Sequence, residues 1–251
     1  MTAGVKRART DDRLELPPPY TLVTLREVGD AFAHAVAIAP EQGAGTLVYV
    51  GRFDLAEFAV VLEPDEPLRS ARRTLYLGMT ALVDALAAHA PPEKPIEVRW
   101  PDAVLVDLGL VGGGRIAWPE GTKEDETPDW MVFAASIRTV SMGEAEPGMT
   151  PLAAALEQEG FEEFGSDRLV ESFARHLMVA VDACQEHGFG AVAKDYLARL
   201  PRASGVRRDI DETGDLLVRR VGKAEVERHR LAPLLAAPSW LDPATGGPKL
   251  A

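Results

Sequence analysis

The stretch Val98-Arg99-Trp100-Pro101-Asp102, followed by the apolar run 103–108 and by Gly112-Gly113-Gly114-Arg115, decides the fold. A β-rich segment, 96–100, ends at the proline, because proline cannot donate to a β-ladder. Two more strands are predicted at 103–108 and 115–118. Glycine permits the positive φ of a tight turn, so we assign the three glycines to a hairpin turn between these strands. A phosphate-binding loop is the alternative, but no helix is predicted to begin after the glycines.

Outward from this stretch, hydrophobic periodicity predicts a chain of alternating helices and strands. The predicted helices share apolar residues at helical spacing or a capping residue, and they span 31–38, 70–89, 151–159, 166–186 and 189–200. The predicted strands share β-rich or alternating composition, and they span 20–25, a hairpin within 45–62, 96–100, 103–108, 115–118, 130–140 and short segments within 205–235.

Composition changes divide the chain into three predicted parts. Residues 1–16 are polar without periodicity and predict a flexible arm, and the prolines at 17–19 begin the ordered part. Residues 17–200 form the main domain, which we expect to be α+β, with a mixed β-sheet packed by helices. Pro201 marks a change to short strands, so 201–251 is expected to hold a small β domain and a tail.

The charge and the cysteine count exclude several classes of function. The chain has 251 residues and a net charge of −12, from 27 basic and 39 acidic residues, which argues against nucleic acid as a partner. The lone Cys184 excludes an internal disulfide and a cysteine-rich zinc site and favours a reducing compartment. No apolar run approaches the roughly 20 residues that span a bilayer. We therefore expect a cytoplasmic protein without a membrane partner.

The segment that ends in Arg99-Trp100-Pro101-Asp102 resembles the biotin–protein ligase branch of the biotin/lipoate ligase superfamily. In that branch a strand ends in Lys-Trp-Pro-Asn-Asp, and the following hairpin carries Lys-x-x-Gly. The order of elements is also similar, and strand 133–138 lies where the family has Gly-x-Gly-x-Asn. The resemblance implies a mixed sheet packed by helices, as in biotin ligases and class II aminoacyl-tRNA synthetases. It further implies that the small β domain is SH3-like.

The resemblance implies a defined chemistry. ATP activates a carboxylic acid as an acyl-adenylate, and a lysine of an acceptor protein then attacks that adenylate. The implied cofactors are ATP and Mg²⁺, the implied substrate is the small-molecule acid biotin or lipoate, and the implied partner is a biotin or lipoyl carrier protein. Such a site needs cationic donors and a metal ion to offset the phosphate charge, and a loop that excludes water.

Two residues are implied to be catalytic. Asp102 stands for the asparagine of the strand-end motif and Ala103 for its aspartate, so Asp102 is also the candidate magnesium ligand. Arg115 stands where the family has the lysine that contacts the activated carboxylate. Arginine keeps the positive charge but differs from lysine in shape and reach, so the exchange is not conservative.

The implied ligand-binding residues are Gly51, Arg52, Arg99, Trp100 and Arg138. The first two are what remains of the Gly-Arg-Gly-Arg-x-Gly loop that covers the adenylate in the family. Trp100 lies either beside the ligand or in the core. If the resemblance holds in detail, four guanidinium groups converge on one cleft and require an anion between them, from Arg52, Arg99, Arg115 and Arg138. The alternative is that each arginine pairs with a nearby acid such as Glu97, Asp102 or Asp107.

Two functions from different classes follow. The first is a biotin- or lipoate–protein ligase that forms an acyl-adenylate and transfers the acid to a protein lysine. The second is a non-catalytic, ligase-like protein that binds an anionic ligand or a carrier domain. The shortened Gly51-Arg52 loop and the exchange at Arg115 favour the second, whereas the order of elements fits both. The oligomeric state stays open, with a homodimer among the candidates.

Overall fold

A seven-stranded mixed sheet forms the centre of the computed structural model, which describes residues 14–142, 152–162 and 164–250. The strands lie in the order β1-β2-β3-β7-β6-β5-β4. Neighbouring strands are antiparallel except β1 and β2, which are parallel. The strands are β1 (Thr21–Leu25), β2 (Thr46–Val50), β3 (Leu55–Leu62), β4 (Ile96–Arg99), β5 (Ala103–Val106), β6 (Gly109–Ala117) and β7 (Met131–Arg138).

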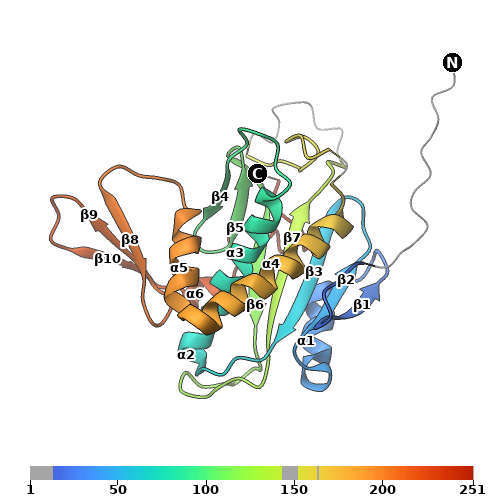
Figure 1. Ribbon diagram of the computed structural model, residues 1–251, viewed down its shortest axis with the longest axis horizontal. Coiled ribbons are helices and arrows are strands. Elements are labelled where there is room, and N and C mark those ends of the chain that lie inside the picture. Colours follow the sequence, from blue (N-terminus) through green and yellow to red (C-terminus); the bar gives the residue numbers. More distant parts are fainter. Residues whose placement is uncertain (1–13, 143–151, 163, 251) are drawn as a thin grey trace.

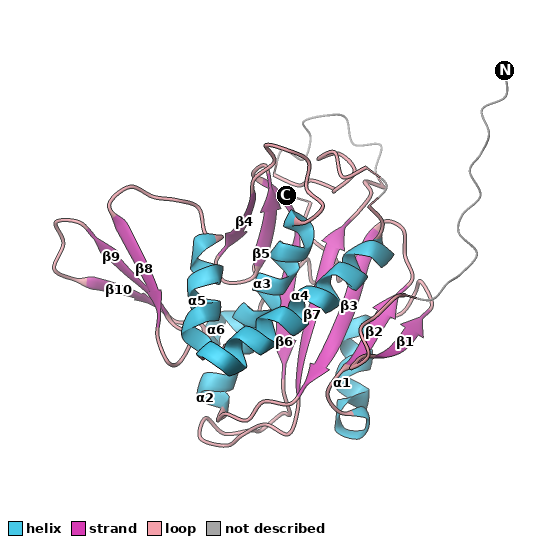
Figure 2. Cartoon of the chain, in the orientation of Figure 1, coloured by secondary structure: helices cyan, strands magenta, loops and turns pink. Residues whose placement is uncertain are grey.

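Helices cover both faces of this sheet, and a small second sheet lies beside one end (Figure 1). The helices are α1 (Ala31–Gln42), α2 (Leu68–Ala71), α3 (Thr74–Ala87), α4 (Ser166–His187), α5 (Phe189–Ala198) and α6 (Ala232–Leu235). The small sheet is antiparallel, in the order β10-β9-β8, and its strands are β8 (Val206–Ile210), β9 (Leu216–Arg220) and β10 (Val226–His229). The predicted α+β fold class is confirmed, and the two sheets stand apart in Figure 2.

Strand alternation gives the large sheet two different faces. In β7, Phe133, Ala135 and Ile137 point into the main core, where α3 and α4 pack. We call this side the inner face. Ala134 points to the opposite, outer face, where α1 packs through small residues such as Ala35. The side chains at 57, 115, 136 and 138 belong to the outer face by the same alternation.

The three glycines lie inside strand β6, and the prediction of a hairpin turn there is wrong. The turn between β5 and β6 is made by Asp107 and Leu108, whose φ angles are 47° and 71°. Close packing explains the glycines. A Cβ on Gly112 would lie 1.9 Å from the Ser136 carbonyl oxygen, and one on Gly113 would lie 2.4 Å from Cδ1 of Trp240. Strand β6 therefore carries no side chains where its neighbours approach most closely.

Other segments also differ from the sequence prediction. The expected helix 70–89 is divided into α2 and α3, and no helix is present in the described part of 151–159. That segment instead follows β6, since the Leu110 N–H donates to the Leu152 carbonyl at 2.8 Å. Of the expected arm, 1–13 lies outside the described residues, while Leu14 packs against the core.

Strand β4 is an edge of the large sheet, and one backbone donor on its free edge is already bonded within the chain. The Val98 N–H donates to the carbonyl of Arg199 at 2.8 Å, and Arg199 follows directly after α5. Exposed edge strands invite pairing with other chains, and this contact occupies a donor on the free side of β4. The same contact holds the end of α5, and therefore the start of the small sheet, against β4.

The packing of α3 on β7 gives a first prediction. A Cβ added to Gly78 would lie 2.2 Å from Cδ2 of Phe133, so Gly78→Ala should lower the free energy of unfolding by about 1–3 kcal/mol despite the better helix propensity of alanine. Gly190→Ala in α5 is the matched control, because a Cβ there meets nothing within 4 Å. Urea unfolding measures both variants. Equal stability of the two variants would contradict this packing.

Candidate functional site

A basic pocket lies between the end of β4 and the small sheet. Its volume is about 330 Å³, and its lining includes three arginines, Arg99, Arg208 and Arg220. Trp100 and Val218 contribute apolar surface to the same pocket. Three cations around one small cavity are unusual in a chain with a net charge of −12. Of the predicted site residues, Arg99 and Trp100 are therefore brought together, but with partners that the sequence analysis missed.

The small sheet brings its two arginines to this pocket by alternation. Arg208 shares a face of β8 with Val206, and Arg220 shares a face of β9 with Val218. The register pairs residue 206 with 220 and residue 208 with 218, so the two arginines are diagonal neighbours. Arg208 donates through Nη1 to the Pro201 carbonyl at 2.7 Å, and Arg220 donates through Nε to Glu227 at 3.0 Å. Since a guanidinium has five N–H donors, each arginine keeps donors for a ligand.

Trp100 is held in a chain of hydrogen bonds that joins the two sheets. Its indole Nε1 donates to the Tyr76 hydroxyl at 3.0 Å, and that hydroxyl donates to the Gly214 carbonyl at 2.6 Å. Burial raises the pKa of Tyr76, so its phenol stays protonated and remains a donor. The His229 ring of β10 lies 6.1 Å from the Trp100 ring, centroid to centroid. These contacts fix one wall of the basic pocket.

The other predicted arginines do not line the basic pocket with Arg99. Arg52 and Arg115 instead both lie close enough to Glu57 to lower the pKa of that carboxyl, against the larger effect of burial. Arg52 forms an ion pair with Asp54 at 2.7 Å inside the connection 51–54. This hydrogen-bonded pair raises the pKa of Arg52 and lowers the pKa of Asp54. Arg138 donates through Nη2 to the Pro248 carbonyl at 2.7 Å. Gly51 is exposed in the same short connection as Arg52.

Arg115 lies in a third place, under the first turn of α1. Its guanidinium carbon is 3.8 Å from the centroid of the Phe32 ring, and its Nη2 is 3.8 Å from Oδ1 of Asp30. Burial lowers the pKa of Arg115. Arg115 is opposite Ala134 in the register, and Arg138 is four residues further along β7, which is about 13 Å at the usual rise of a strand. Strand geometry therefore separates the backbone positions of the two arginines, and the two guanidiniums have different partners.

The acids that the sequence suggested form no ion pair with these arginines among the described residues, although Arg99 lies close enough to Asp102 to lower the pKa of that carboxyl against the larger effect of burial. Asp107 pairs with Lys94, at 2.7 Å, and Arg52 pairs with the acid two positions away. The basic pocket differs from these pairs, because its three arginines come from three separate strands.

Glu57 and Ser136 lie on the outer face near Arg115. The Ala31 N–H, at the start of α1, donates to Oε1 of Glu57 at 2.8 Å, and burial raises the pKa of this carboxyl. Ser136 lies opposite Glu57 in the register, and its buried Oγ has no hydrogen-bond partner among the described residues. Alternation places a carboxyl, a hydroxyl and a guanidinium on one face of three adjacent strands.

Asp102 is buried with 3% of its surface exposed, and both carboxylate oxygens are occupied. Ser239 donates through Oγ to Oδ1 at 2.6 Å and through its N–H to Oδ2 at 3.1 Å. Burial raises the pKa of Asp102, and the bonds from Ser239 oppose this shift. The described residues contain no group of three or more His, Cys, Asp or Glu that could hold a metal ion. Asp102 therefore has no unoccupied carboxylate oxygen for Mg²⁺ while Ser239 is in place.

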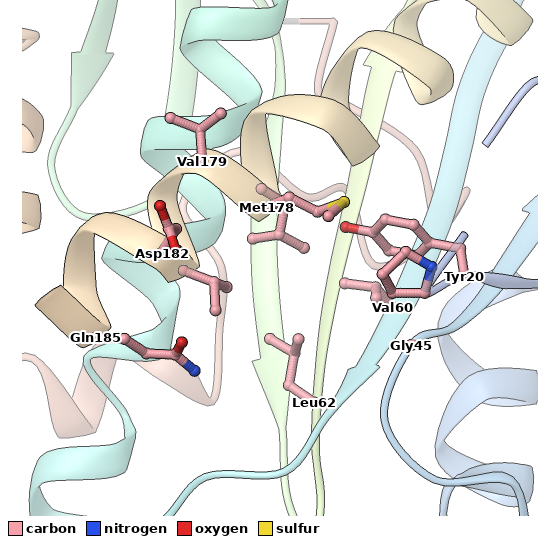
Figure 3. Close-up of a pocket in the computed structure, with 11 residues that line it drawn as sticks. Tyr20, Gly45, Val60, Leu62, Met178, Val179, Asp182 and Gln185 are labelled. Atoms are coloured by element: carbon pink, nitrogen blue, oxygen red, sulfur yellow. The ribbon is translucent and has the colours of Figure 1, made fainter. Parts of the chain in front are cut away.

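A larger pocket, of about 490 Å³, lies between α4 and the sheet edge where β2 begins, after Gly45, and β3 ends, at Leu62 (Figure 3). Tyr20 and Val60 line one side, and Asp182 of α4 lies on the other side. Burial raises the pKa of Tyr20 to about 12, and its hydroxyl donates to the Ala174 carbonyl at 2.9 Å. No arginine or lysine lines this pocket, so it lacks the charge that an anionic ligand requires.

The sequence contained a partial signal for the residues that were missed. Arg208 and Arg220 alternate with apolar residues on either side of the turn 211–214, which places both on the apolar face of a predicted hairpin. No local pattern indicates Ser239 or Trp240, because their contacts with residues 102 and 114 cross more than 120 positions of the chain, with separations of 137 and 126.

The fold and these motifs agree with what comparisons with known proteins show. Residues 16–198 match the model of the biotin/lipoate A/B protein ligase family. The chain belongs to this family. The superfamily that the Arg-Trp-Pro-Asp stretch suggested is therefore confirmed. No helix in the described parts of the chain has the length and apolar character to cross a membrane.

Individual relatives extend this result. A biotin–[acetyl-CoA-carboxylase] ligase from Paracoccus denitrificans is 26% identical over 182 residues, which cover 64% of this chain and 72% of that protein. A biotin protein ligase-like protein of unknown function from Silicibacter has a TM-score of 0.76 at 26% identity, over 89% of this chain and 99% of its own. The biotin protein ligase of Aquifex aeolicus shares the fold, with a TM-score of 0.66 at 13% identity, over 84% and 97% of the two chains.

The buried carboxyl of Asp102 predicts a pH dependence of stability. Its pKa is higher in the folded than in the unfolded chain, so the folded chain binds the proton more tightly and stability falls as the pH rises through this interval. Asp102→Asn removes this loss while its amide oxygen still accepts from Ser239. The variant should gain stability relative to the wild type at pH 7 and lose that gain below pH 4, as measured by urea unfolding.

Asp54→Asn is the control with the opposite sign. The pKa of Asp54 is lowered by Arg52, so its contribution to stability is present at neutral pH and is lost as the pH falls. This variant should be less stable than the wild type at pH 7. A wild-type advantage over Asp102→Asn at pH 7 would contradict the assignment of a destabilising buried charge.

Proposed function

We propose that this chain is a non-catalytic, ligase-like protein that binds an anionic ligand in the basic pocket. The observation that carries the proposal is the meeting of Arg99, Arg208 and Arg220 around about 330 Å³. Arg220 is paired with Glu227, whereas Arg99 and Arg208 form no ion pair within 4 Å among the described residues. An anion in the pocket would balance their charge and accept charge-assisted hydrogen bonds. The volume lies within the range of small-molecule sites, roughly 300–1,000 Å³.

The shape of the pocket restricts the ligand further. Trp100 and Val218 offer apolar surface beside the arginines, so a suitable ligand joins an anionic group to an apolar or aromatic part. A nucleotide phosphate, an acyl phosphate and a carboxylic acid such as biotin or lipoate meet this description. Arginine binds the oxygens of phosphate and carboxylate in a bidentate manner, which fits all three.

The state of the family's adenylation residues supports a role without catalysis. The loop over the adenylate is reduced to Gly51-Arg52, and Arg52 is already paired with Asp54. Both oxygens of Asp102 accept bonds from Ser239, and Arg115 packs on Phe32. In this arrangement Asp102 has no unoccupied oxygen for a metal ion, and Arg52 is engaged by Asp54.

A second candidate function is favoured by the family and by the Paracoccus relative. It is an ATP-dependent biotin (or lipoate) protein ligase that forms an acyl-adenylate with Mg²⁺ and transfers the acid to a lysine of a biotin or lipoyl carrier protein. The relative's name supports biotin as the acid and a carboxylase carrier domain as the acceptor. Pyrophosphate release from ATP with biotin, and separately with lipoate, distinguishes the two. Binding without release supports the first candidate, and turnover supports the second.

The basic pocket predicts a specific loss of affinity. Arg208→Gln should weaken the binding of ATP or of pyrophosphate by about tenfold, because a hydrogen bond to a charged group contributes about 1.5 kcal/mol or more. Isothermal titration of the full chain measures this, and Arg99→Gln should act in the same direction.

Arg207→Gln is the matched control, since Arg207 precedes Arg208 in β8 and its exposed side chain points to the opposite face of the strand. The two variants have the same charge change, so long-range electrostatics affects both equally. Equal affinities of Arg207→Gln and Arg208→Gln, or no binding of any of these anions to the wild type, would contradict the pocket as an anion site.

A further inference from the structure

The three arginines of the basic pocket are not equivalent, because only one of them is held by an acid. Arg220 donates through Nε to Oε1 of Glu227 at 3.0 Å and through Nη2 to Oε2 of the same carboxylate at 3.4 Å. Arg99 and Arg208 line the same pocket without an ion pair among the described residues. Glu227 therefore balances one of the three charges, and two guanidiniums keep an uncompensated charge.

The other acids nearby do not remove this surplus. Glu227 lies opposite Val218 in the register of β10 and β9, on the side of the pocket. Asp102 lies near Arg99, but both of its oxygens accept bonds from Ser239. The whole chain has a net charge of −12, so at long range it repels a dianion more strongly than a monoanion. A preference for a dianion must therefore come from the pocket itself.

The two uncompensated arginines come from different sheets. Arg99 is the last residue of β4 in the large sheet, and Arg208 is the central residue of β8 in the small sheet. A carboxylate has two oxygens in one plane, which the fork of a single guanidinium satisfies. A phosphate monoester has three terminal oxygens around the phosphorus and can accept from both arginines. The origin of the arginines therefore suits a phosphate group better than a carboxylate.

The apolar lining strengthens this requirement for charge balance. Leu200, Val206 and Leu216 line the pocket together with Trp100. The Trp100 indole N–H already donates to the Tyr76 hydroxyl, so the indole offers the ligand a ring surface and no donor. Charges interact more strongly beside apolar groups than in water, and a charge left unbalanced there is unfavourable. The ligand that fits carries two negative charges on one group and an apolar part beside it.

We propose that the basic pocket selects a small organic phosphate monoester, bound as the dianion by Arg99 and Arg208, and that Glu227 sets this selectivity by holding Arg220. The inference rests on the proposed function, because it assigns the ligand class of the same pocket. It excludes monocarboxylic acids such as biotin and lipoate as the preferred ligands there. Glu227 is a positioning residue, which acts on the ligand only through Arg220.

Two ligands of the same shape test the charge selectivity on the full chain. Phenyl phosphate is a dianion at pH 8, whereas phenyl sulfate has the same ring and the same three terminal oxygens with one negative charge. Isothermal titration should show about tenfold tighter binding of phenyl phosphate, because it balances both arginines. Equal affinities would overturn the inference and leave the proposed anion site standing. If phenyl phosphate, phenyl sulfate and pyrophosphate all fail to bind, the inference and the proposed function both fail.

The ratio of these two affinities tests the role of the uncompensated arginines. Arg208→Gln leaves one uncompensated guanidinium, so the preference for phenyl phosphate should fall from about tenfold to about twofold or less. Arg207→Gln changes the net charge equally but lies on the opposite face of β8, and it should keep the wild-type ratio. The same ratio in both variants would overturn the inference, because selectivity would then not depend on the pocket.

Glu227→Gln tests the second half of the proposal. It releases Arg220 and should tighten the binding of phenyl phosphate by about tenfold. Glu225→Gln is the matched control, because Glu225 is exposed just before β10 and forms no ion pair among the described residues. The gain should disappear when Glu227→Gln is combined with Arg220→Gln, since Arg220 transmits the effect. No gain, an equal gain in the control, or a gain that persists in the double variant would overturn the role of Glu227.

Discussion

The structure depends on the close packing of its parts against a strand without side chains. Strand β6 carries Gly112, Gly113 and Gly114, and each lies against a different neighbour. The backbone of β7 approaches the first, the Trp240 indole covers the second, and Met79 of α3 lies against the third. Larger residues at these positions would push β7, helix α3 and the segment that carries Trp240 away from strand β6. The three glycines therefore allow close packing on both faces of the sheet, with α3 on the inner face and Trp240 on the outer face.

Much of the fold could be predicted from the sequence because its signals are local. Helical and strand periodicities placed most elements, and the Arg-Trp-Pro-Asp stretch identified the family. The three glycines do not distinguish two structures, since a run of three permits a turn and permits close approach equally well. The turn fell instead on Asp107 and Leu108, which adopt positive φ without being glycine. Leu152 and its neighbours were taken for a helix, but their backbone hydrogen bonds to β6 stabilise an extended segment.

The site was harder to predict because side-chain partners are set by tertiary structure. Arg52 and Arg138 were expected in one cleft, yet a neighbouring acid satisfies the first and distant carbonyls satisfy the second. Only Arg99 and Trp100 remain at a shared pocket, and Arg208 and Arg220 join them from a separate sheet. The Arg-Trp-Pro-Asp motif indicates the strand end at which a ligand is expected. It does not indicate which distant parts of the chain pack against that strand end.

The edge contact at strand β4 has a consequence for assembly. The carbonyl that follows α5 accepts from Val98, so a strand from another molecule cannot extend the sheet on that side without first breaking an internal bond. Growth of a continuous sheet between copies is thereby hindered at this end.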